Sequence, residues 1–442
     1  MKRDIYSKLL EWKESNDRKP LMLYGARQVG KTYILKELGR NEFDNMVCIN
    51  CYKNPIVEKI FSQDVDITRI LRELSAYSGE NIQPSSTFLF FDEVQEIPEV
   101  VASLKYFYEE RPELHVAVAG SLLGVMEMKG ISFPVGKVDI MHLYPMVFTE
   151  FLEAVGETGK LDLLRDAAMR TSVNSLLPSF VELLRQYYYV GGMPEAVKKY
   201  IETGDQEKVR KIQLDIIEEY EADIAKHAGR DALKARKVMQ SIPGQLAKEN
   251  KKYIFGALKK GARASEYENA IQWLIDAGII YKVCRTAKAE LPLKFYLEDD
   301  TFKLFLLDVG LLGAISNVSA PMILLGNNIF SEYKGAFTEN YVLTQLITCN
   351  PIEISYFTKD NSTVEIDFLI QFAGKLIPIE VKAEENVKSK SFRQFITIDH
   401  SEKNLRGIRM SMKGYADQGW MENIPLFAII PYLNDILPLS HG

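Results

Sequence analysis

The chain has 442 residues, of which 47% are hydrophobic and 26% are charged, as is usual for a protein with a folded core. Domains of roughly 100–200 residues make about two to four domains the expectation for this length. The net charge of −6 excludes a general polyanion binder, so any nucleic-acid surface must be a local basic patch.

The N-terminal stretch and the cysteines bear on the compartment. The first 20 residues are charged and amphipathic, without the apolar core of a signal peptide, and no apolar run is long enough to predict a membrane span. Cys48 and Cys51 form a C-x-x-C in a predicted strand, but no second pair completes a zinc site, which favours buried thiols. We therefore expect a cytoplasmic protein without structural disulfides and without a membrane partner.

Residues 1–158 alternate short apolar runs with helical stretches. The apolar runs read PLMLYG, MVCIN, STFLFFDEV and LHVAVAGS. Runs of this kind between helices are typical of a parallel sheet that helices cover on both faces. The sequence therefore predicts an α/β fold for residues 1–158.

A phosphate-binding loop follows the first apolar run. The segment GARQVGKT matches G-x-x-x-x-G-K-[ST], with a strand before it and a helix after it. The glycines let backbone N–H groups wrap the phosphates, Lys31 reaches the β- and γ-phosphates, and Thr32 ligates Mg²⁺. The cofactors expected are ATP, with GTP left open, and Mg²⁺. The predicted nucleotide-binding residues are Gly25, Arg27, Gln28, Val29, Gly30, Lys31, Thr32 and Tyr33.

Two acids end the third apolar run and support the same site. Asp92 is expected to hold Mg²⁺ through water, and Glu93 is placed to orient and deprotonate the attacking water. A nucleotide kinase is an alternative, but the Asp-Glu pair favours water activation over transfer to a second nucleotide. The next strand ends at Ser121, where the side chain either senses the γ-phosphate or belongs to a simple Gly-Ser turn.

Residues 159–229 have a helical pattern that is broken at Gly191, Gly192 and Pro194, where we expect a turn between helices. In residues 230–325, short helices precede strands, an order that suggests a winged helix. Ser265 and Glu268 form a capping box at the start of its third helix, and a C-terminal glycine cap is expected at Gly278.

A basic segment overlaps the predicted winged helix. The span 234–263 holds nine basic residues and one acid, Glu249. Such a balance favours contact with a nucleic-acid backbone, although a solvated face that docks another domain is the alternative. The predicted DNA contacts are Lys251, Lys252, Lys259, Lys260 and Arg263.

Residues 326–442 open with an amphipathic helix over 331–347, and strands follow over 354–359, 363–372 and 375–382. A later run, AIIPYL, is also expected to be a strand. Period-2 alternation places Asp367 on the polar face of the second strand. It also places Glu380 and Lys382 together on the polar face of the third strand. Two carboxylates and a lysine suit metal-assisted phosphodiester hydrolysis, while a solvated Glu–Lys pair is the plain alternative.

The motifs GARQVGKT, FFDEVQEI, AVAGS, HLYPMVFTEFL and YVGGMPEAV together resemble a large group of prokaryotic AAA-type ATPases, over nearly the whole chain. The resemblance implies an ATPase core, a helical lid at 159–229, a winged-helix segment and a restriction-endonuclease-like α/β domain at 326–442. The last domain is similar to the PD-(D/E)xK nuclease pattern, with Glu339 as a further carboxylate. The family usually has an arginine where this chain has Lys137, and lysine lacks the planar fork of an arginine finger.

These features predict an ATP-hydrolysing AAA-type ATPase that is associated with DNA and carries a C-terminal nuclease-like domain. Catalytic roles fall to Lys31, Asp92, Glu93 and Ser121. The alternative is a regulatory nucleotide switch whose nuclease-like domain is inactive and binds a protein partner. Rings are common among AAA-type cores, so a homo-oligomer is a further expectation of the resemblance.

Overall fold

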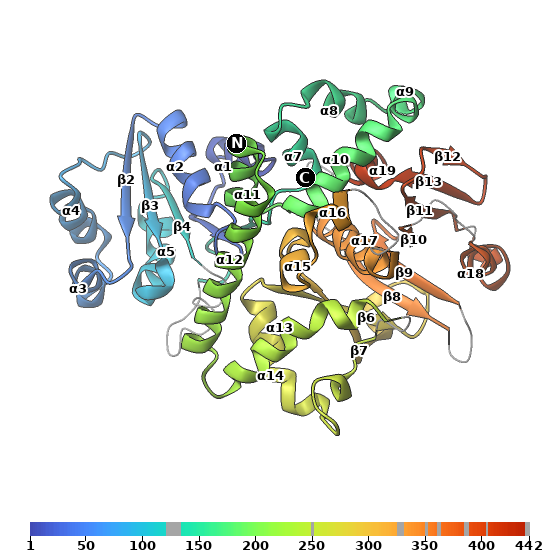
Figure 1. The fold of residues 1–442 in the computed structure, drawn as a ribbon. Coiled ribbons are helices and arrows are strands. Elements are labelled where there is room, and N and C mark those ends of the chain that lie inside the picture. Colours follow the sequence, from blue (N-terminus) through green and yellow to red (C-terminus); the bar gives the residue numbers. More distant parts are fainter. Residues whose placement is uncertain are drawn as a thin grey trace. The chain divides into compact units, whose positions relative to one another are not determined.

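The structure is a computed structural model that describes residues 1–120, 134–248, 252–324, 331–349, 352–359, 364–383, 389–403 and 405–437. The chain forms two compact units (Figure 1). The first holds residues 1–144 with 276–278, and the second holds residues 145–275 with 279–442. The domain boundaries after residues 158, 229 and 325 do not coincide with this division and stay predictions.

A five-stranded parallel sheet forms the centre of the first unit, in the order β2-β3-β4-β1-β5. Its strands are β1 (Leu21–Tyr24), β2 (Asn45–Asn50), β3 (Thr87–Asp92), β4 (His115–Ala119) and β5 (Asp139–His142). The strand β4 lies between β1, which leads into the phosphate loop, and β3, which ends at Asp92. The parallel sheet predicted for this region is confirmed.

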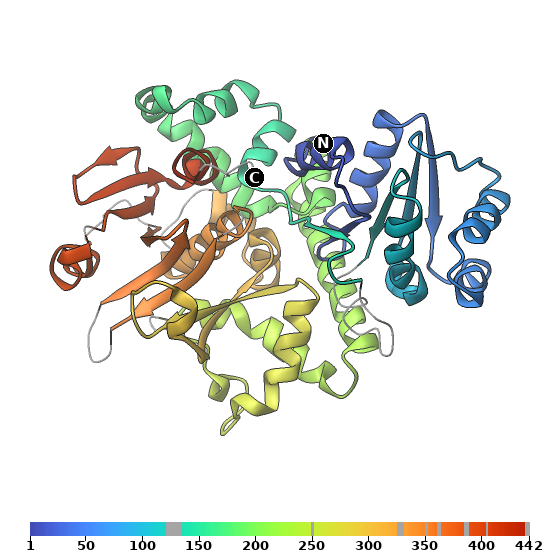
Figure 2. The same cartoon turned by 180° about the vertical axis from the view of Figure 1, so that it is seen from behind.

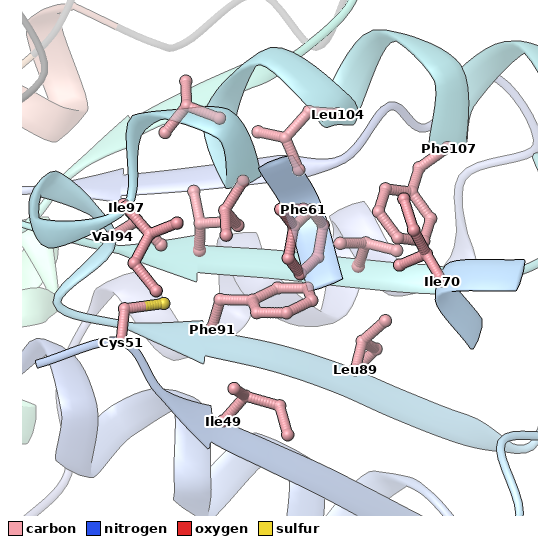
Figure 3. Packing of buried hydrophobic residues seen from close by; sticks show 14 of the residues in the cluster. Ile49, Cys51, Phe61, Ile70, Leu89, Phe91, Val94, Ile97, Leu104 and Phe107 are labelled. Carbon is pink, nitrogen blue, oxygen red and sulfur yellow. The ribbon is translucent and has the colours of Figure 1, made fainter. Parts of the chain in front are cut away.

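Helices cover both faces of this sheet, which is why the three central strands β1, β3 and β4 are buried along their whole length. The helices are α1 (Ile5–Glu14), α2 (Lys31–Glu42), α3 (Pro55–Gln63), α4 (Ile67–Ser78) and α5 (Pro98–Glu110). On one face, α3, α4 and α5 contact one another over a core that includes Phe61, Phe91 and Phe107 (Figure 3). On the other, Trp12 of α1 packs edge-on against Phe88, with ring centroids 6.4 Å apart.

Cys51 lies in the first of these cores, beside Phe91 and Val94 (Figure 3). Its side chain is buried, and burial raises the pKa of the thiol to about 12. The neighbouring Cys48 is only partly buried. A protonated thiol among apolar side chains acts as a small hydrophobic group, as the sequence predicts for Cys51.

The second unit is rich in helices around a second sheet, seen from behind in Figure 2. Its helices before residue 280 are α7 (Phe148–Ala154), α8 (Thr158–Arg165), α9 (Arg170–Ser175), α10 (Leu177–Val190), α11 (Pro194–Thr203), α12 (Gln206–His227), α13 (Ala232–Leu246) and α14 (Ala264–Asp276). The later helices are α15 (Val309–Ile315), α16 (Ala320–Leu324), α17 (Ser331–Leu346), α18 (Lys390–Gln394) and α19 (Ile429–Ile436). No described helix combines the length and the apolar character that a membrane span needs.

The second sheet is mixed and has eight strands in the order β12-β13-β11-β10-β9-β8-β6-β7. They are β6 (Ile280–Thr286), β7 (Leu297–Leu306), β8 (Glu353–Thr358), β9 (Glu365–Phe372), β10 (Lys375–Lys382), β11 (Gly407–Ser411), β12 (Ala416–Asp417) and β13 (Met421–Pro425). The strands predicted near 354–382 are confirmed. The sheet also crosses position 325, because β6 of the predicted winged helix pairs with β8.

The region of the predicted winged helix contains α13, α14 and the antiparallel pair β6–β7, and the winged-helix interpretation stays a prediction. Gly278 has a φ of +70°, and the N–H of Ile279 bonds to the carbonyl of Leu274, which is the expected glycine cap. The capping box is wrong in its position. The helix α14 begins at Ala264, so Ser265 already lies inside its first turn.

The predicted strand AIIPYL is also wrong, because these residues enter the helix α19. Pro431 has no N–H and is poorly suited to a paired strand, but it fits the first turn of a helix, where N–H groups have no partner. Ile429, Tyr432 and Leu433 are all buried. Their spacing of three and four residues is typical of one helix face.

The Gly-Gly turn predicted between two helices is confirmed between α10 and α11. Gly191 has a φ of +73°, and the N–H of Gly192 donates to the carboxylate of Asp308 at 2.6 Å. The same carboxylate caps α15 by accepting the N–H of Leu311 at 2.9 Å. One buried acid therefore connects a helix turn to the start of a helix more than 100 residues later.

Asp308 gives this connection a dependence on pH. Burial raises the pKa of its carboxyl from 3.8 to about 6, so the folded state keeps the proton to higher pH than the unfolded state. The group therefore stabilises the fold most below pH 3.8, and this contribution is lost as pH rises to about 6. Urea unfolding at several pH values should show the wild type losing up to about 3 kcal/mol relative to Asp308→Asn across this range. A constant difference would contradict the assignment.

Candidate nucleotide-binding site and a second acidic cluster

The phosphate loop runs from the end of β1 to the start of α2. Two of its positions require glycine for structural reasons. A Cβ at Gly25 would overlap the carbonyl oxygen of Leu143. Gly30 caps α2 with a φ of +97°, a conformation that favours glycine. The first N–H groups of α2 thus follow the loop directly, where phosphate oxygens are expected to bind.

Lys31 lies over its own loop. Its Nζ donates to the carbonyl oxygens of Gly25 at 2.9 Å and Ala26 at 2.7 Å. Burial lowers the pKa of the amine to about 8, while Glu93 and Asp92 act in the opposite direction. A phosphate bound in the loop would replace the carbonyl contacts by a full negative charge, which favours the protonated amine.

Thr32 and Asp92 come together as predicted, from α2 and β3. The Thr32 hydroxyl donates to Asp92 Oδ1 at 3.1 Å. Burial raises the pKa of Asp92, and the hydrogen bond from Thr32 opposes that shift. A hydroxyl and a carboxylate beside a phosphate loop are the oxygen ligands that Mg²⁺ takes with ATP, so these residues fit that cofactor.

Glu93 follows Asp92 in the left-handed backbone region, with a φ of +54°. Its Oε2 accepts a hydrogen bond from Nε2 of Gln95. A Cβ at Gly120, just after β4, would lie 2.7 Å from the side-chain oxygen Oε1 of Gln95. The sequence prediction missed Gln95, since a glutamine two residues after an acid is not a distinctive signal.

The remaining predicted loop residues differ in burial and in backbone conformation. Val29 is buried, and its carbonyl accepts from the buried guanidinium of Arg3 at 2.9 Å. Arg27 and Tyr33 are exposed, and Gln28 has a φ of +65°. Val29 can therefore offer only its backbone to a nucleotide. The prediction missed Arg3, which lies far from the motif in sequence, and Ser121 lies outside the described residues.

Lys137 stands where the resembling family has an arginine. Its Nζ forms an ion pair with Glu109 at 2.9 Å and lies 5.3 Å from the ring centroid of Tyr108. These contacts occupy the charge within the first unit. The position offers a lysine that is already paired, which agrees with the doubt raised by the sequence about an arginine finger.

The C-terminal acids and lysine also come together, on the antiparallel pair β9–β10. Asp367 Oδ2 accepts the N–H of Val381 at 2.8 Å, and Glu380 Oε1 lies 3.2 Å from Lys382 Nζ. Burial raises the pKa of Glu380, with Lys382 acting against the shift. The hairpin register therefore places Asp367 beside Glu380, as the alternation of the two strands predicts.

Glu339, the further predicted carboxylate, lies beside another lysine. Lys303, which is 1% exposed, has its Nζ 3.8 Å from Glu339 Oε2 and 2.8 Å from Glu365 Oε1. Within the described parts of the chain, no group of three or more His, Cys, Asp or Glu side chains is arranged to hold a metal ion. Glu339 thus takes part in a buried ion network around Lys303.

Only some cations of the basic segment are exposed and able to contact a nucleic acid. Lys252, Lys259, Lys260 and Arg263 are exposed, and Lys251 lies outside the described residues. Two further cations of the segment are bound within the unit, since Lys234 pairs with Asp231 and Arg236 with Glu221. The exposed cations therefore include Lys237 of α13 and Lys248 as well as those just before α14.

Comparison with known proteins divides the chain into three matched segments. Residues 17–152 match the AAA domain, residues 181–322 match a domain of unknown function (DUF8612), and residues 334–429 match another (DUF4143). A search of curated proteins finds no match.

Solved structures resemble the chain more distantly. The Walker-type ATPase of Pyrococcus abyssi is 17% identical over 71% of this chain and 95% of its own, with a TM-score of 0.45. The RuvB Holliday junction branch migration motor of Thermotoga maritima is 14% identical over 64% of this chain and 89% of its own, with a TM-score of 0.31. The match to the AAA domain and the geometry of the phosphate loop agree: residues 17–152 are similar to the AAA domain and carry a P-loop between β1 and α2.

Proposed function

We propose that the chain hydrolyses ATP at its P-loop and that it uses this reaction to control a DNA-associated C-terminal domain with nuclease-like chemistry. The observation that carries the first part is the contact of Thr32 with Asp92, at 3.1 Å, directly beside the phosphate loop. A strand-end carboxylate and a P-loop hydroxyl meet in this way where ATP and Mg²⁺ bind together.

The residues of the site have separate roles in hydrolysis. Loop N–H groups and Lys31 hold and neutralise the phosphates, while Thr32 and Asp92 would hold Mg²⁺. Mg²⁺, when bound, supplies charge neutralisation at the β- and γ-phosphate oxygens. Gln95 Nε2 donates to Oε2 of Glu93, and the other carboxylate oxygen can accept a proton from the attacking water.

The DNA-associated part of the proposal is supported by two features of the second unit. Asp367, Glu380 and Lys382 lie together on β9 and β10, and that set suits metal-assisted cleavage of a phosphodiester. Lys259, Lys260 and Arg263 are exposed beside α14, where a nucleic-acid backbone would find positive charge.

An inactive nuclease-like domain that binds a protein partner is the second candidate, and a specific observation favours it. Glu380 is held on both sides, by Lys382 and by the hydroxyl of Ser389, and Glu339 is engaged by Lys303. Among the described residues, the cluster then offers two carboxylates and no group of three. Such a site would hold a metal ion less firmly than a larger carboxylate set.

DNA cleavage separates the two candidates. Wild type is expected to cut plasmid or linear DNA in Mg²⁺ or Mn²⁺, with a dependence on ATP, and Asp367→Ala should reduce the cleavage rate at least about 100-fold by removing a metal ligand. Gel analysis of the cleaved DNA provides the measurement. Asp299→Ala, which removes an exposed acid from β7 of the same sheet, serves as the control. Intact ATP turnover without any cleavage would leave the partner-binding candidate.

A further inference from the structure

A pocket of about 520 Å³ opens beside the C-terminal sheet, and its walls are unusually basic. Four cations line it: Lys390, Arg393, Arg409 and Lys413. Of the described residues that line the pocket, none is acidic. A polar pocket with this charge in a chain of net charge −6 is a strong local attraction for a multiply charged anion.

The side chain of Arg409 lines the pocket and is held in one orientation by hydrogen bonds. This residue is 4% exposed, its Nε donates to Asn423 Oδ1 at 2.9 Å, and its Nη1 donates to the hydroxyl of Ser389 at 3.3 Å. Asn423 is also held in place, since its Oδ1 accepts from the hydroxyl of Ser411 at 2.7 Å. A guanidinium that is already oriented loses little freedom when it binds an anion.

The other three cations stand at the rim and are available. Lys390, Arg393 and Lys413 are exposed, and they form no ion pair with the described residues around them. Exposed cations that form no ion pair within the described residues lose little when an anion binds, whereas Lys234 and Arg236 of the basic segment must first release an acid. Among the described residues, the rim therefore adds charge that no ion pair already uses.

Trp420 supplies an aromatic wall. It is half-buried and packs against Phe392, with ring centroids 5.9 Å apart, which fixes the orientation of the indole. Aromatic side chains in basic grooves stack on nucleobases and so add to the affinity for a ligand that carries a base. Cations and a fixed aromatic ring in one pocket select a ligand that has both phosphate and base.

We propose that this pocket binds a phosphorylated nucleotide, either at the end of a nucleic-acid strand or as a free nucleotide, at a site separate from the P-loop. The pocket connects to the acidic cluster, because Ser389 both accepts from Arg409 and donates to Glu380. A nucleotide held there lies one residue away from the carboxylates proposed to cut a phosphodiester. Only the source of the nucleotide rests on the proposed function; binding itself does not.

The test uses the full chain with Lys31→Ala, which removes nucleotide binding at the P-loop, in EDTA to prevent cleavage. The probe is a fluorescein-labelled, 5′-phosphorylated single-stranded tetranucleotide, followed by fluorescence polarisation, with AMP, inorganic phosphate and a tetraglutamate peptide as competitors. Replacing Lys390, Arg393 and Lys413 by glutamine together should weaken probe binding at least about tenfold. The same change at the exposed residues Lys198, Lys211 and Lys226 has equal effect on net charge and should leave binding unchanged.

Two further variants make the result specific. Trp420→Leu should weaken binding of the tetranucleotide about fivefold or more and leave competition by inorganic phosphate as it was. Swapping lysine and arginine at the three rim positions keeps the charge and should keep binding. Displacement by AMP as strong as by unlabelled tetranucleotide identifies a free nucleotide, and displacement only by the tetranucleotide identifies a strand.

Several results would overturn the proposal. Equal binding by the rim variant and its matched control would do so, as would equal displacement by inorganic phosphate or by tetraglutamate, which would make the pocket a general anion or acidic-peptide site. ATP turnover is measured separately on chains that retain Lys31. Intact turnover without pocket binding rejects the pocket alone, and pocket binding without turnover rejects the proposed hydrolysis alone.

Discussion

Replacing Glu93 with glutamine is expected to leave ATP binding nearly unchanged and to reduce hydrolysis at least about 100-fold. The substitution keeps the shape of the side chain but removes the carboxylate that accepts a proton from water. It leaves Lys31, Thr32 and Asp92 in place, so the contacts to the phosphates and to Mg²⁺ remain. Binding of a fluorescent ATP analogue and release of inorganic phosphate measure the two quantities separately.

Two variants show whether this effect belongs to Glu93. Glu96→Gln removes an exposed acid from the same turn and should hydrolyse ATP like the wild type. Lys31→Ala removes the cation of the phosphate loop and should lose binding as well as hydrolysis. If Glu93→Gln lost affinity as Lys31→Ala does, or kept its turnover, the assignment of Glu93 as general base would be wrong.

Gly192→Ala is expected to destabilise the second unit by about 3 kcal/mol or more. A Cβ at this position would overlap the carbonyl oxygen of Met146, and main-chain atoms cannot move aside as a flexible side chain can. The glycine is fixed from both ends, since its N–H bonds to Asp308 and its carbonyl accepts the N–H of Met146 at 2.7 Å. Urea unfolding followed by circular dichroism should show the loss.

Gly244→Ala is the matched control for this prediction. Gly244 lies in α13, and a Cβ there has open space around it. Alanine is the better helix former by about 1 kcal/mol, so this variant should equal or exceed the wild type in stability. Equal unfolding midpoints for Gly192→Ala and Gly244→Ala would show that the close approach to Met146 carries no energetic weight.

The parts of the fold that sequence predicted well are those where local pattern and burial agree. Apolar strands such as β3 are buried on both faces, and their short continuous apolar runs are typical of a covered parallel sheet. The phosphate loop combines a strand, two constrained glycines and a helix start within a short segment. The hairpin β9–β10 alternates along both strands, so the juxtaposition of Asp367 and Glu380 follows from period and register alone.

What sequence did not predict depends on distant partners. Arg3 reaches the carbonyl of Val29, and Arg409 reaches Ser389 and Asn423, across separations that no local pattern encodes. The run AIIPYL has the composition of a strand, and only its packing and Pro431 decide for a helix. The extension of the second sheet from β8 to β6 likewise arises from tertiary pairing.

ATP turnover by the purified wild type, with and without DNA, tests the central claim most directly. Phosphate release is followed in Mg²⁺ with no DNA, with plasmid and with single-stranded DNA, beside Glu93→Gln as the inactive reference. The proposed function predicts turnover above that reference and an increase with at least one form of DNA. Turnover no higher than that of Glu93→Gln would contradict the ATPase, and turnover that no DNA changes would contradict its coupling to nucleic acid.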